Sequence, residues 1–310
     1  MEEATPAAHA NKKIEALLQH GSMLEVEPMF ALAQFEAYLS DLAALNIGAN
    51  YSDLGISERR HSNRPVYFDV QDAAKGMYSF ATPYQIQSDP QSIRPGTIAK
   101  IGISGIMRAE SGLSSPGADS TVSYLRSAYA NENIAAVILD IKSGGGESLA
   151  GNMIANAVSE RNKPVVSFAY FAASAAYRVA AQTDEIIAAG NEAEFGSIGT
   201  MITMDTELIN EYRKRYTDLY GQSAPGKNAE FRAAMAGNYA PLQNRVDTLT
   251  SNFQEKIKQL RPLRGPEKMK SETVNGSLWG ADDAKQRGLV DMIGNMQTAV
   301  QRAYALRAKY

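Results

Sequence analysis

The amino-acid sequence predicts a layered α/β fold with crossover helices, and two observations support this. From Thr97 onward, short runs rich in branched apolar residues alternate with amphipathic segments, which is the order typical of βα units. One of these runs, Ile134–Ile141, is apolar without a break, as expected of a parallel strand buried on both faces. We therefore expect a mainly parallel sheet with helices packed against it.

The expected elements follow in a regular order. A strand at 98–107 precedes a helix that starts near 119, with Asp119 or Ser120 as its cap. The strand 134–141 ends in a glycine-rich turn, and a helix with an apolar face follows. The remaining expected elements are a strand at 164–171, a helix from Ser174, a strand at 184–190, a helix at 205–217 and a long helix at 242–260. The apolar stripe of the last helix indicates core packing or a subunit contact.

Residues 1–65 are predicted to be a mainly helical extension and linker, separate from a domain at 66–310. The polar run 55–65 is typical of a linker. Upstream of it, apolar residues recur at three- and four-residue steps, as on one face of a helix: Phe30, Leu32, Phe35, Leu39 and Leu42. This stripe must be buried against the domain, a neighbouring subunit or a partner.

Composition excludes several classes of function. The net charge of −3 and the absence of a dense basic run give no sign of a nucleic-acid partner. The chain has no cysteine, so disulfides, thiol nucleophiles and cysteine metal sites are excluded, and nothing indicates a cofactor or a metal. The longest apolar run, 164–177, is shorter than the roughly 20 residues that span a bilayer. We expect a soluble, cytoplasmic protein without a membrane anchor.

Ser174 stands out because it interrupts a run of alanine, valine and aromatic residues at a predicted strand-to-helix junction. Serine packs where alanine packs, but such a junction also holds a nucleophilic hydroxyl. The three histidines, His9, His20 and His61, all lie in the first fifth of the chain. A lysine that has lost its proton is therefore the expected base. Sequence alone does not choose among four: Lys142, Lys163, Lys214 and Lys227.

The glycine run Gly144–Gly146 follows a buried strand and precedes a helix. Glycines let the backbone turn sharply there, and exposed N–H groups of such a turn bind an anion or an oxyanion. A tight turn without a ligand explains the three glycines equally well. No lysine followed by serine or threonine comes after the glycines, which argues against a phosphate-binding loop.

The order of four motifs resembles the signal-peptide-peptidase-A family, the S49 serine peptidases. These motifs are SGGG (143–146), AASAAYRVAAQTDEIIA with Ser174, EFGSIGTMI with GSIG at 196–199, and SAPGKNAE with Lys227. The segment 276–294 is also similar to the closing segment of the family, so the resemblance covers about residues 97–300. One departure is SGGG, where SPGG is commoner.

The resemblance implies a ClpP/crotonase-like fold and a serine endopeptidase with a Ser-Lys dyad. Ser174 is implied as nucleophile and Lys227, neutral through burial, as its base. Backbone N–H groups at Gly145, Gly146 and Ala175 are implied as the oxyanion hole. Ser197 is expected to orient the lysine, although a plain turn serine explains it nearly as well, and Lys142 is a rival base or an electrostatic modulator. The family also tends to form rings, so we expect a homo-oligomer.

A narrower resemblance concerns residues 21–39, which are similar to the N-terminal segment of phage proteases that mature procapsids. It implies capsid or scaffold proteins as substrates, and the host cytoplasm or the procapsid interior as the location. One alternative is a bacterial cytoplasmic protease of the signal-peptide-peptidase type. Two others are a crotonase-like acyl-CoA enzyme, for which Glu147 is the nearest acidic candidate, and a non-catalytic assembly protein.

Overall fold

The computed structural model of the chain describes residues 24–26, 66–68, 80–81, 93–111 and 116–310. The predicted helical extension at 1–65 therefore lies outside the described residues, apart from three that form a strand. The strands are β1 (Leu24–Val26), β2 (Val66–Phe68), β3 (Phe80–Ala81), β4 (Thr97–Ser104), β5 (Ile134–Ser143), β6 (Gly145–Glu147), β7 (Val165–Ala173), β8 (Glu185–Ala188), β9 (Glu194–Gly196), β10 (Leu278–Gly280) and β11 (Met292–Ile293).

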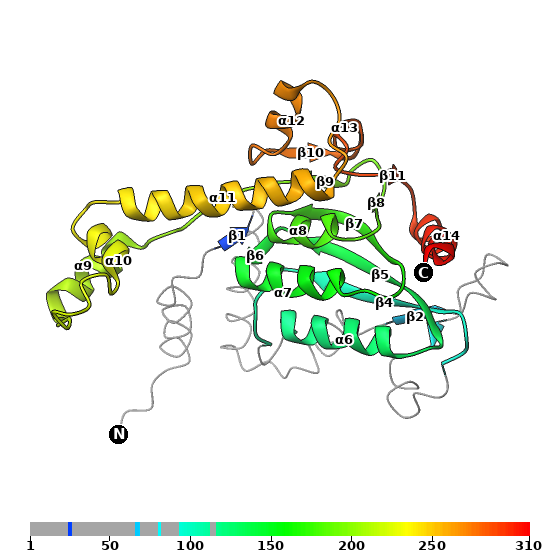
Figure 1. Cartoon of the computed structure of the whole chain (residues 1–310), viewed down its shortest axis with the longest axis horizontal. Helices are drawn as coiled ribbons and strands as arrows, with labels where there is room; N and C mark the ends of the chain where they lie inside the picture. The colour runs from blue at the N-terminus through cyan, green and yellow to red at the C-terminus, as the bar shows by residue number, and fades with distance from the viewer. Residues whose placement is uncertain (1–23, 27–65, 69–79, 82–92, 112–115) are drawn as a thin grey trace, which may run out of the picture.

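The helices alternate with these strands in the first half of the domain and dominate the second half (Figure 1). They are α6 (Ala118–Ala130), α7 (Ser148–Ser159), α8 (Ala175–Ala181), α9 (Thr206–Arg215), α10 (Ala229–Met235), α11 (Ala240–Leu260), α12 (Glu267–Thr273), α13 (Ala281–Arg287), α14 (Met296–Ala305) and the 3₁₀ turn Leu306–Lys309.

The described strands form a nine-stranded sheet whose main path is β10-β9-β7-β5-β4-β2-β3; off this path, β8 pairs with β7, and β11 pairs with β8. Its centre is parallel, because β4 pairs with β5, β5 with β7, and β7 with both β8 and β9 in that sense. The predicted α/β fold with βα units is confirmed. A separate two-stranded sheet joins β1 to β6.

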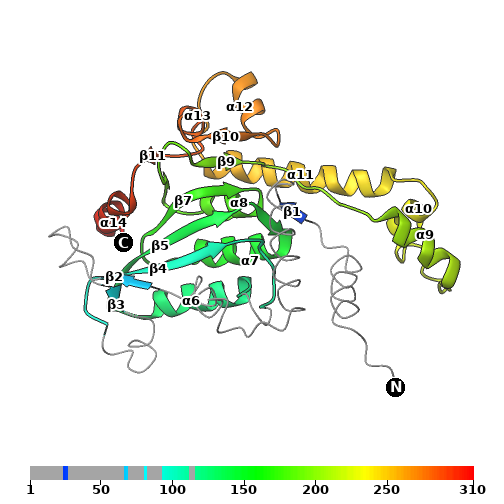
Figure 2. The same cartoon turned by 180° about the vertical axis from the view of Figure 1, so that it is seen from behind.

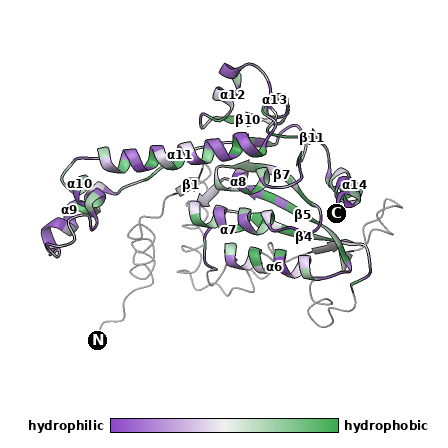
Figure 3. Ribbon diagram, viewed as in Figure 1, coloured by the Kyte–Doolittle hydropathy of each residue, from purple (hydrophilic) through white to green (hydrophobic). Residues whose placement is uncertain are grey.

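Helices cover both faces of the sheet (Figures 1 and 2). Side chains alternate along a strand, so Leu139 and Ile141 of β5 pack in the core beneath α6, α7 and α8. Ile138 of the same strand packs on the opposite face with Val300 of α14. Figure 3 shows hydrophobic residues concentrated in the central strands, whereas α9 is mostly hydrophilic. The uninterrupted apolar run of β5 is explained by burial on both faces.

One predicted helix cap is wrong. The helix α6 has Gly117 at its N-cap position, and no side chain caps it. Asp119 lies in the first turn instead, where its carboxylate accepts a hydrogen bond from the hydroxyl of Ser111 at 2.6 Å. Because Ser111 also accepts from the Gly117 N–H, it links the helix start to the preceding segment. Ser111 lies six residues before Gly117, so capping rules, which consider only the residues next to the helix start, do not predict this contact.

The helices α9 and α10 and the first half of α11 form a projecting arm, residues 206–250, which stands away from the sheet (Figures 1 and 2). In the apolar stripe of α11, Phe253 and Ile257 are buried in the core. The stripe residues nearer the tip of the arm, Leu242, Val246 and Leu249, are only half-buried among the described residues. Only the C-terminal half of the stripe therefore packs in the core.

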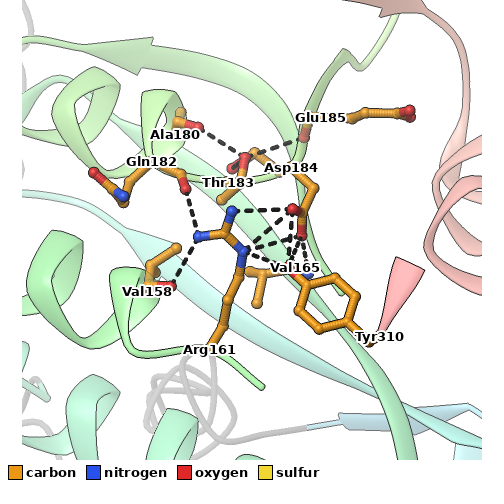
Figure 4. A network of polar contacts seen from close by, with 10 residues as sticks. Val158, Arg161, Val165, Ala180, Gln182, Thr183, Asp184, Glu185 and Tyr310 are labelled. Atoms are coloured by element: carbon orange, nitrogen blue, oxygen red, sulfur yellow. Dashed lines mark hydrogen bonds and ion pairs between the residues drawn. The ribbon is translucent and has the colours of Figure 1, made fainter. Parts of the chain in front are cut away.

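A polar network ties the end of α7 to the start of β7, the loop before β8 and the C-terminal residue (Figure 4). The Arg161 guanidinium pairs with the Asp184 carboxylate at 3.0 Å, and Asp184 also accepts the Val165 N–H at 2.8 Å and the Tyr310 hydroxyl. Arg161 donates further to two backbone carbonyls. Burial opposes the charge of Arg161, but the hydrogen bond and charge of Asp184 raise its pKa above the ordinary value.

Replacing Arg161 by methionine should destabilise the fold by roughly 2–4 kcal/mol, because it leaves the Asp184 carboxylate without its cation in a largely buried position. The measurement is the free energy of unfolding by chemical denaturation. The matched control is Arg126→Met, which removes an exposed pair with Glu160 and should cost less than about 0.5 kcal/mol. Equal effects of the two changes would contradict a structural role for the Arg161 network.

Candidate active site

Three neighbouring strands end at one edge of the sheet and place the candidate residues together. Ser143, the last residue of β5, lies opposite Ala172 of β7, and Ala173 lies opposite Gly196 of β9. In a parallel sheet the carboxyl ends of strands lie at the same edge. The glycine turn, Ser174 and Ser197, which follow these three ends, therefore meet there.

Ser174 has an unusual backbone. Its φ of 54° and ψ of −122° lie in a region that residues with a side chain rarely adopt, and it directly precedes α8. The Ser174 N–H donates to the Gly196 carbonyl at 2.8 Å, which fixes this conformation. The residue is 2% exposed, and its hydroxyl makes one long hydrogen bond among the described residues, to the Gly199 carbonyl at 3.5 Å.

The glycine turn is built against Met107. The Met107 N–H donates to the Gly145 carbonyl at 2.8 Å, and the Glu147 N–H donates to the Met107 carbonyl at 2.9 Å. A Cβ on Gly146 would lie 2.1 Å from the Met107 carbonyl oxygen, so this position requires glycine. The Gly145 N–H donates to the Ser143 hydroxyl at 3.1 Å.

The Gly146 N–H faces away from Met107. Along a strand, successive backbone groups point to opposite sides, and the Gly145 carbonyl and the Glu147 N–H both point to Met107. The N–H and carbonyl of Gly146 therefore point to the other edge of β6. There the strand β1 runs antiparallel, with Glu25 opposite Gly146. Of the two candidate glycine donors, Gly146 is therefore the one whose N–H points to the edge of β6 where another strand can pair, whereas the Gly145 N–H binds the Ser143 hydroxyl.

Ala175 begins α8, where the first N–H groups of a helix have no acceptor within the helix. The helix α8 contacts β6, so the Ala175 backbone lies near the glycine turn. Gly151 lets α7 approach the start of α8 closely, because a Cβ there would lie 3.0 Å from the Ala175 Cβ.

Ser197 follows β9 and also has a positive φ, 50°. Its N–H donates to the Ser277 carbonyl at 2.8 Å, which anchors the GSIG turn to the segment before β10. The structure thus places Ser197 beside Ser174, through the pairing of β9 with β7. No hydrogen bond between Ser197 and Lys227 is found in the described part of the chain.

Lys227 is not brought to Ser174 within one chain. It lies in the loop before α10, on the projecting arm, and its side chain is exposed. The hydrogen bonds of the described residues include none between Lys227 and Ser174, whose hydroxyl contacts Gly199 instead. The described residues of the same chain therefore do not bury Lys227, although the sequence analysis expects a buried, neutral lysine.

The other three lysines have different surroundings. The Lys142 ammonium lies 4.6 Å from the centre of the Tyr170 ring, on the face of the sheet that carries Ile138. Lys163 precedes β7, a strand of nine residues, so it lies about 30 Å from Ser174. Its ammonium donates to three carbonyls near the end of α6, and burial lowers its pKa. Lys214 is exposed on α9.

Glu147, the acidic candidate of the acyl-CoA alternative, has a structural contact. Its carboxylate accepts the Ala109 N–H at 2.8 Å, which holds the segment after Met107 against the glycine turn. The sequence analysis placed Met107 at the end of a strand but gave it no part in the site, because Met107 contributes backbone groups and not side-chain chemistry. The only signal for this contact in the sequence is the glycine run, because glycines indicate that another backbone segment packs closely against the turn.

Residues 157–309, which include Ser174, the GSIG turn and Lys227, match the family described as Peptidase family S49. The chain carries a peptidase family S49 domain. Protease 4 of Haemophilus influenzae is 31% identical over 225 residues, which cover 68% of this chain and 35% of that protein. The chloroplastic serine protease SPPA of Arabidopsis thaliana is 28% identical over 206 residues, 63% of this chain and 30% of that protein.

The chain spans about a third of the length of these two relatives. Solved structures with a related arrangement include a membrane-bound stomatin-specific protease, with a TM-score of 0.42 and 15% identity over 68% of this chain and 84% of that one. An enoyl-CoA hydratase/isomerase family protein from Silicibacter pomeroyi gives a TM-score of 0.42 and 13% identity over 69% and 80%. Scores of this size support no argument about function.

None of the helices in the described residues has both the length and the apolar character that crossing a membrane requires. No cluster of three or more histidine, aspartate or glutamate side chains arranged to hold a metal ion occurs in that part of the chain.

Replacing Gly146 by alanine should destabilise the protein by about 3 kcal/mol or more, because the new Cβ overlaps the Met107 carbonyl. The measurement is the free energy of unfolding, with the melting temperature as a second readout. The control is Gly199→Ala, where nothing lies within 4 Å of the added Cβ. A Gly146→Ala variant as stable as this control would show that the turn is not built against Met107.

Proposed function

We propose that the chain is a serine endopeptidase in which Ser174 is the nucleophile and Lys227 the general base. The observation that carries the proposal is the backbone of Ser174, which is held in a rarely populated conformation at a strand-to-helix junction. Strain of this kind costs about 1–3 kcal/mol and is concentrated at functional sites. Membership of the domain in peptidase family S49 agrees with it.

The proposed reaction is acyl transfer through a covalent intermediate. The Ser174 Oγ attacks the carbonyl carbon of the scissile peptide while its proton passes to the Lys227 amine. The resulting ammonium returns the proton to the leaving amine nitrogen, and the C–N bond breaks. Water, deprotonated by the same lysine, then hydrolyses the acyl-enzyme and releases Ser174.

The oxyanion of each tetrahedral intermediate needs N–H donors, each worth roughly 2.7–4 kcal/mol of the barrier. We assign Gly146 and Ala175 to this role, because the Gly146 N–H points to the edge of β6 away from Met107 and the Ala175 N–H lies in the first turn of a helix. Gly145 belongs to the same turn and shapes it, since its N–H binds the Ser143 hydroxyl. Ser197, beside Ser174, orients the lysine when the lysine is present.

Lys227 is proposed to reach Ser174 from a neighbouring copy in a homo-oligomer. It is exposed on an arm that projects from the body of its own chain. The arm carries exposed apolar side chains, including Tyr216, Leu219 and Phe231, and the half-buried part of the α11 stripe. A second copy would cover these groups and supply the burial that a neutral lysine requires.

The proposed substrate is an extended protein segment. Capsid or scaffold proteins are the specific substrates that we propose, on the resemblance of residues 21–39 to phage procapsid proteases, and most of those residues lie outside the described chain. Incubation with purified phage capsid and scaffold proteins, followed by mass spectrometry of the products, tests this. A crotonase-like reaction is disfavoured, because the Glu147 carboxylate is already engaged by the Ala109 N–H.

Ser174→Ala should abolish labelling by a serine-reactive phosphonate and lower peptide cleavage by about 10⁴-fold or more, since the attacking atom is lost. Alanine already flanks the position, so the circular dichroism spectrum and melting temperature should stay close to the wild type. A non-catalytic assembly protein predicts no labelling of the wild type. Wild-type cleavage by the variant would rule out the nucleophile.

Lys227→Ala and Lys227→Arg should both be inactive, because arginine stays charged and accepts no proton. Lys142→Ala, the matched control at a nearby strand end, should lose less activity. Mixing the inactive Ser174→Ala and Lys227→Ala proteins under conditions of subunit exchange should restore part of the activity, since one copy then contributes the serine and the other the lysine. An oligomer whose mixtures stay inactive would show that the dyad forms within one chain, and an active Lys227→Arg protein would exclude Lys227 as base.

A further inference from the structure

The strand β1 lies along the free edge of β6 at the candidate active site. Its three residues run antiparallel to β6, with Leu24 opposite Glu147, Glu25 opposite Gly146 and Val26 opposite Gly145. Among the described strands, β6 is the only partner of β1, and the two form a sheet apart from the central one. Removing β1 from this position therefore takes no strand from the core sheet.

The pairing engages the backbone groups on which the active site depends. The Gly145 carbonyl and the Glu147 N–H are bound by Met107, so the Gly146 N–H and carbonyl point to the edge where Glu25 lies. In an antiparallel pair of this kind, the two opposite residues exchange both backbone hydrogen bonds. Glu25 thus takes the N–H that the oxyanion requires, and the carbonyl that would align an extended peptide.

We propose that residues 24–26 are an intramolecular inhibitor, a strand of the chain itself that occupies the peptide-binding edge of β6 and that a substrate must displace. The proposal rests on the proposed peptidase function. An extended substrate binds a sheet edge by the same main-chain hydrogen bonds, so it and β1 exclude each other.

The strength of the contact suits a reversible block. A tethered segment acts at an effective concentration on the order of millimolar. It therefore outcompetes a free peptide that binds the same edge with similar or lower affinity and is present at a lower concentration. A two-stranded pairing is only marginally stable by itself, so a segment of tighter-binding substrate, or a partner that draws the N-terminal segment away, frees the edge. The inhibition is therefore competitive: it raises the apparent KM and leaves kcat unchanged.

The first measurement asks whether the strand is seated on β6. Hydrogen exchange at the Gly146 amide is followed in the full-length Ser174→Ala protein, which cannot cut itself. Glu25→Pro removes the N–H that faces Gly146, and proline is not tolerated in a paired strand position, so exchange should rise at least tenfold. The matched control is Leu24→Pro. It places proline at the first strand residue, where the N–H points away from β6, and should keep the wild-type exchange rate.

The second measurement uses the full-length enzyme with Ser174 intact. Glu25→Pro should lower the KM for an unstructured peptide at least threefold without changing kcat, and Leu24→Pro should not. Faster exchange at Gly146 with an unchanged KM overturns the inhibitor proposal, and so does a fall in kcat, which would make β1 part of the working site. Cleavage of the wild-type chain within or beside residues 24–26, seen by intact mass, also overturns it, because the segment is then a substrate.

Labelling by a serine-reactive phosphonate separates this proposal from the peptidase assignment, because the small probe needs no strand pairing and reacts, although more slowly, whenever β1 leaves the edge of β6. Labelling of both the wild type and Glu25→Pro, with the KM change, supports inhibition by β1. Absence of labelling in both overturns the peptidase assignment, and the inhibition falls with it. Slow exchange at Gly146 that is insensitive to Glu25→Pro would show that β1 does not hold that edge.

Discussion

The parallel register of β5, β7 and β9 is the constraint on which the candidate site depends. It brings the ends of the three strands to one edge of the sheet, so that the glycine turn, Ser174 and the GSIG turn meet although they are far apart in sequence. The rare backbone of Ser174 costs about 1–3 kcal/mol and persists only because its surroundings are fixed. Its N–H is bound by Gly196, and the flanking Ala173 and Ala175 are fully buried.

Much of this arrangement is predictable from local sequence. The unbroken apolar run of β5 signals burial on both faces, and the structure shows both clusters that cover it. The position of Ser174 at the start of a helix follows from where the next apolar run ends. Each of these signals is carried by residues that are adjacent in the chain, and periodicity and turn chemistry describe such residues well.

What the sequence does not reveal is made by distant backbone groups. Met107 holds the glycine turn through its N–H and carbonyl, and every residue type except proline carries both groups. The pairing of β1 with β6 joins segments more than a hundred residues apart, and three residues give no periodic signal. The α11 stripe looks uniform in sequence, yet only its C-terminal residues, Phe253, Ile257 and Leu260, pack in or against the core. How far a helix extends past the body depends on tertiary packing, which no local pattern encodes.

The placement of Lys227 and the pairing of β1 act in the same direction. A single chain keeps the proposed base, Lys227, exposed on the arm and away from Ser174, and it keeps the edge of β6 covered by Glu25. Each feature alone would lower activity, by separate means: one removes the proton acceptor and the other removes the binding edge. In the proposed mechanism, assembly brings Lys227 to Ser174, and a substrate or a partner of the N-terminal segment displaces β1. A peptidase of this design would be inactive where it is dilute and active where its copies and substrates are concentrated together, so its specificity would depend on location as well as on the sequence at the cleavage site.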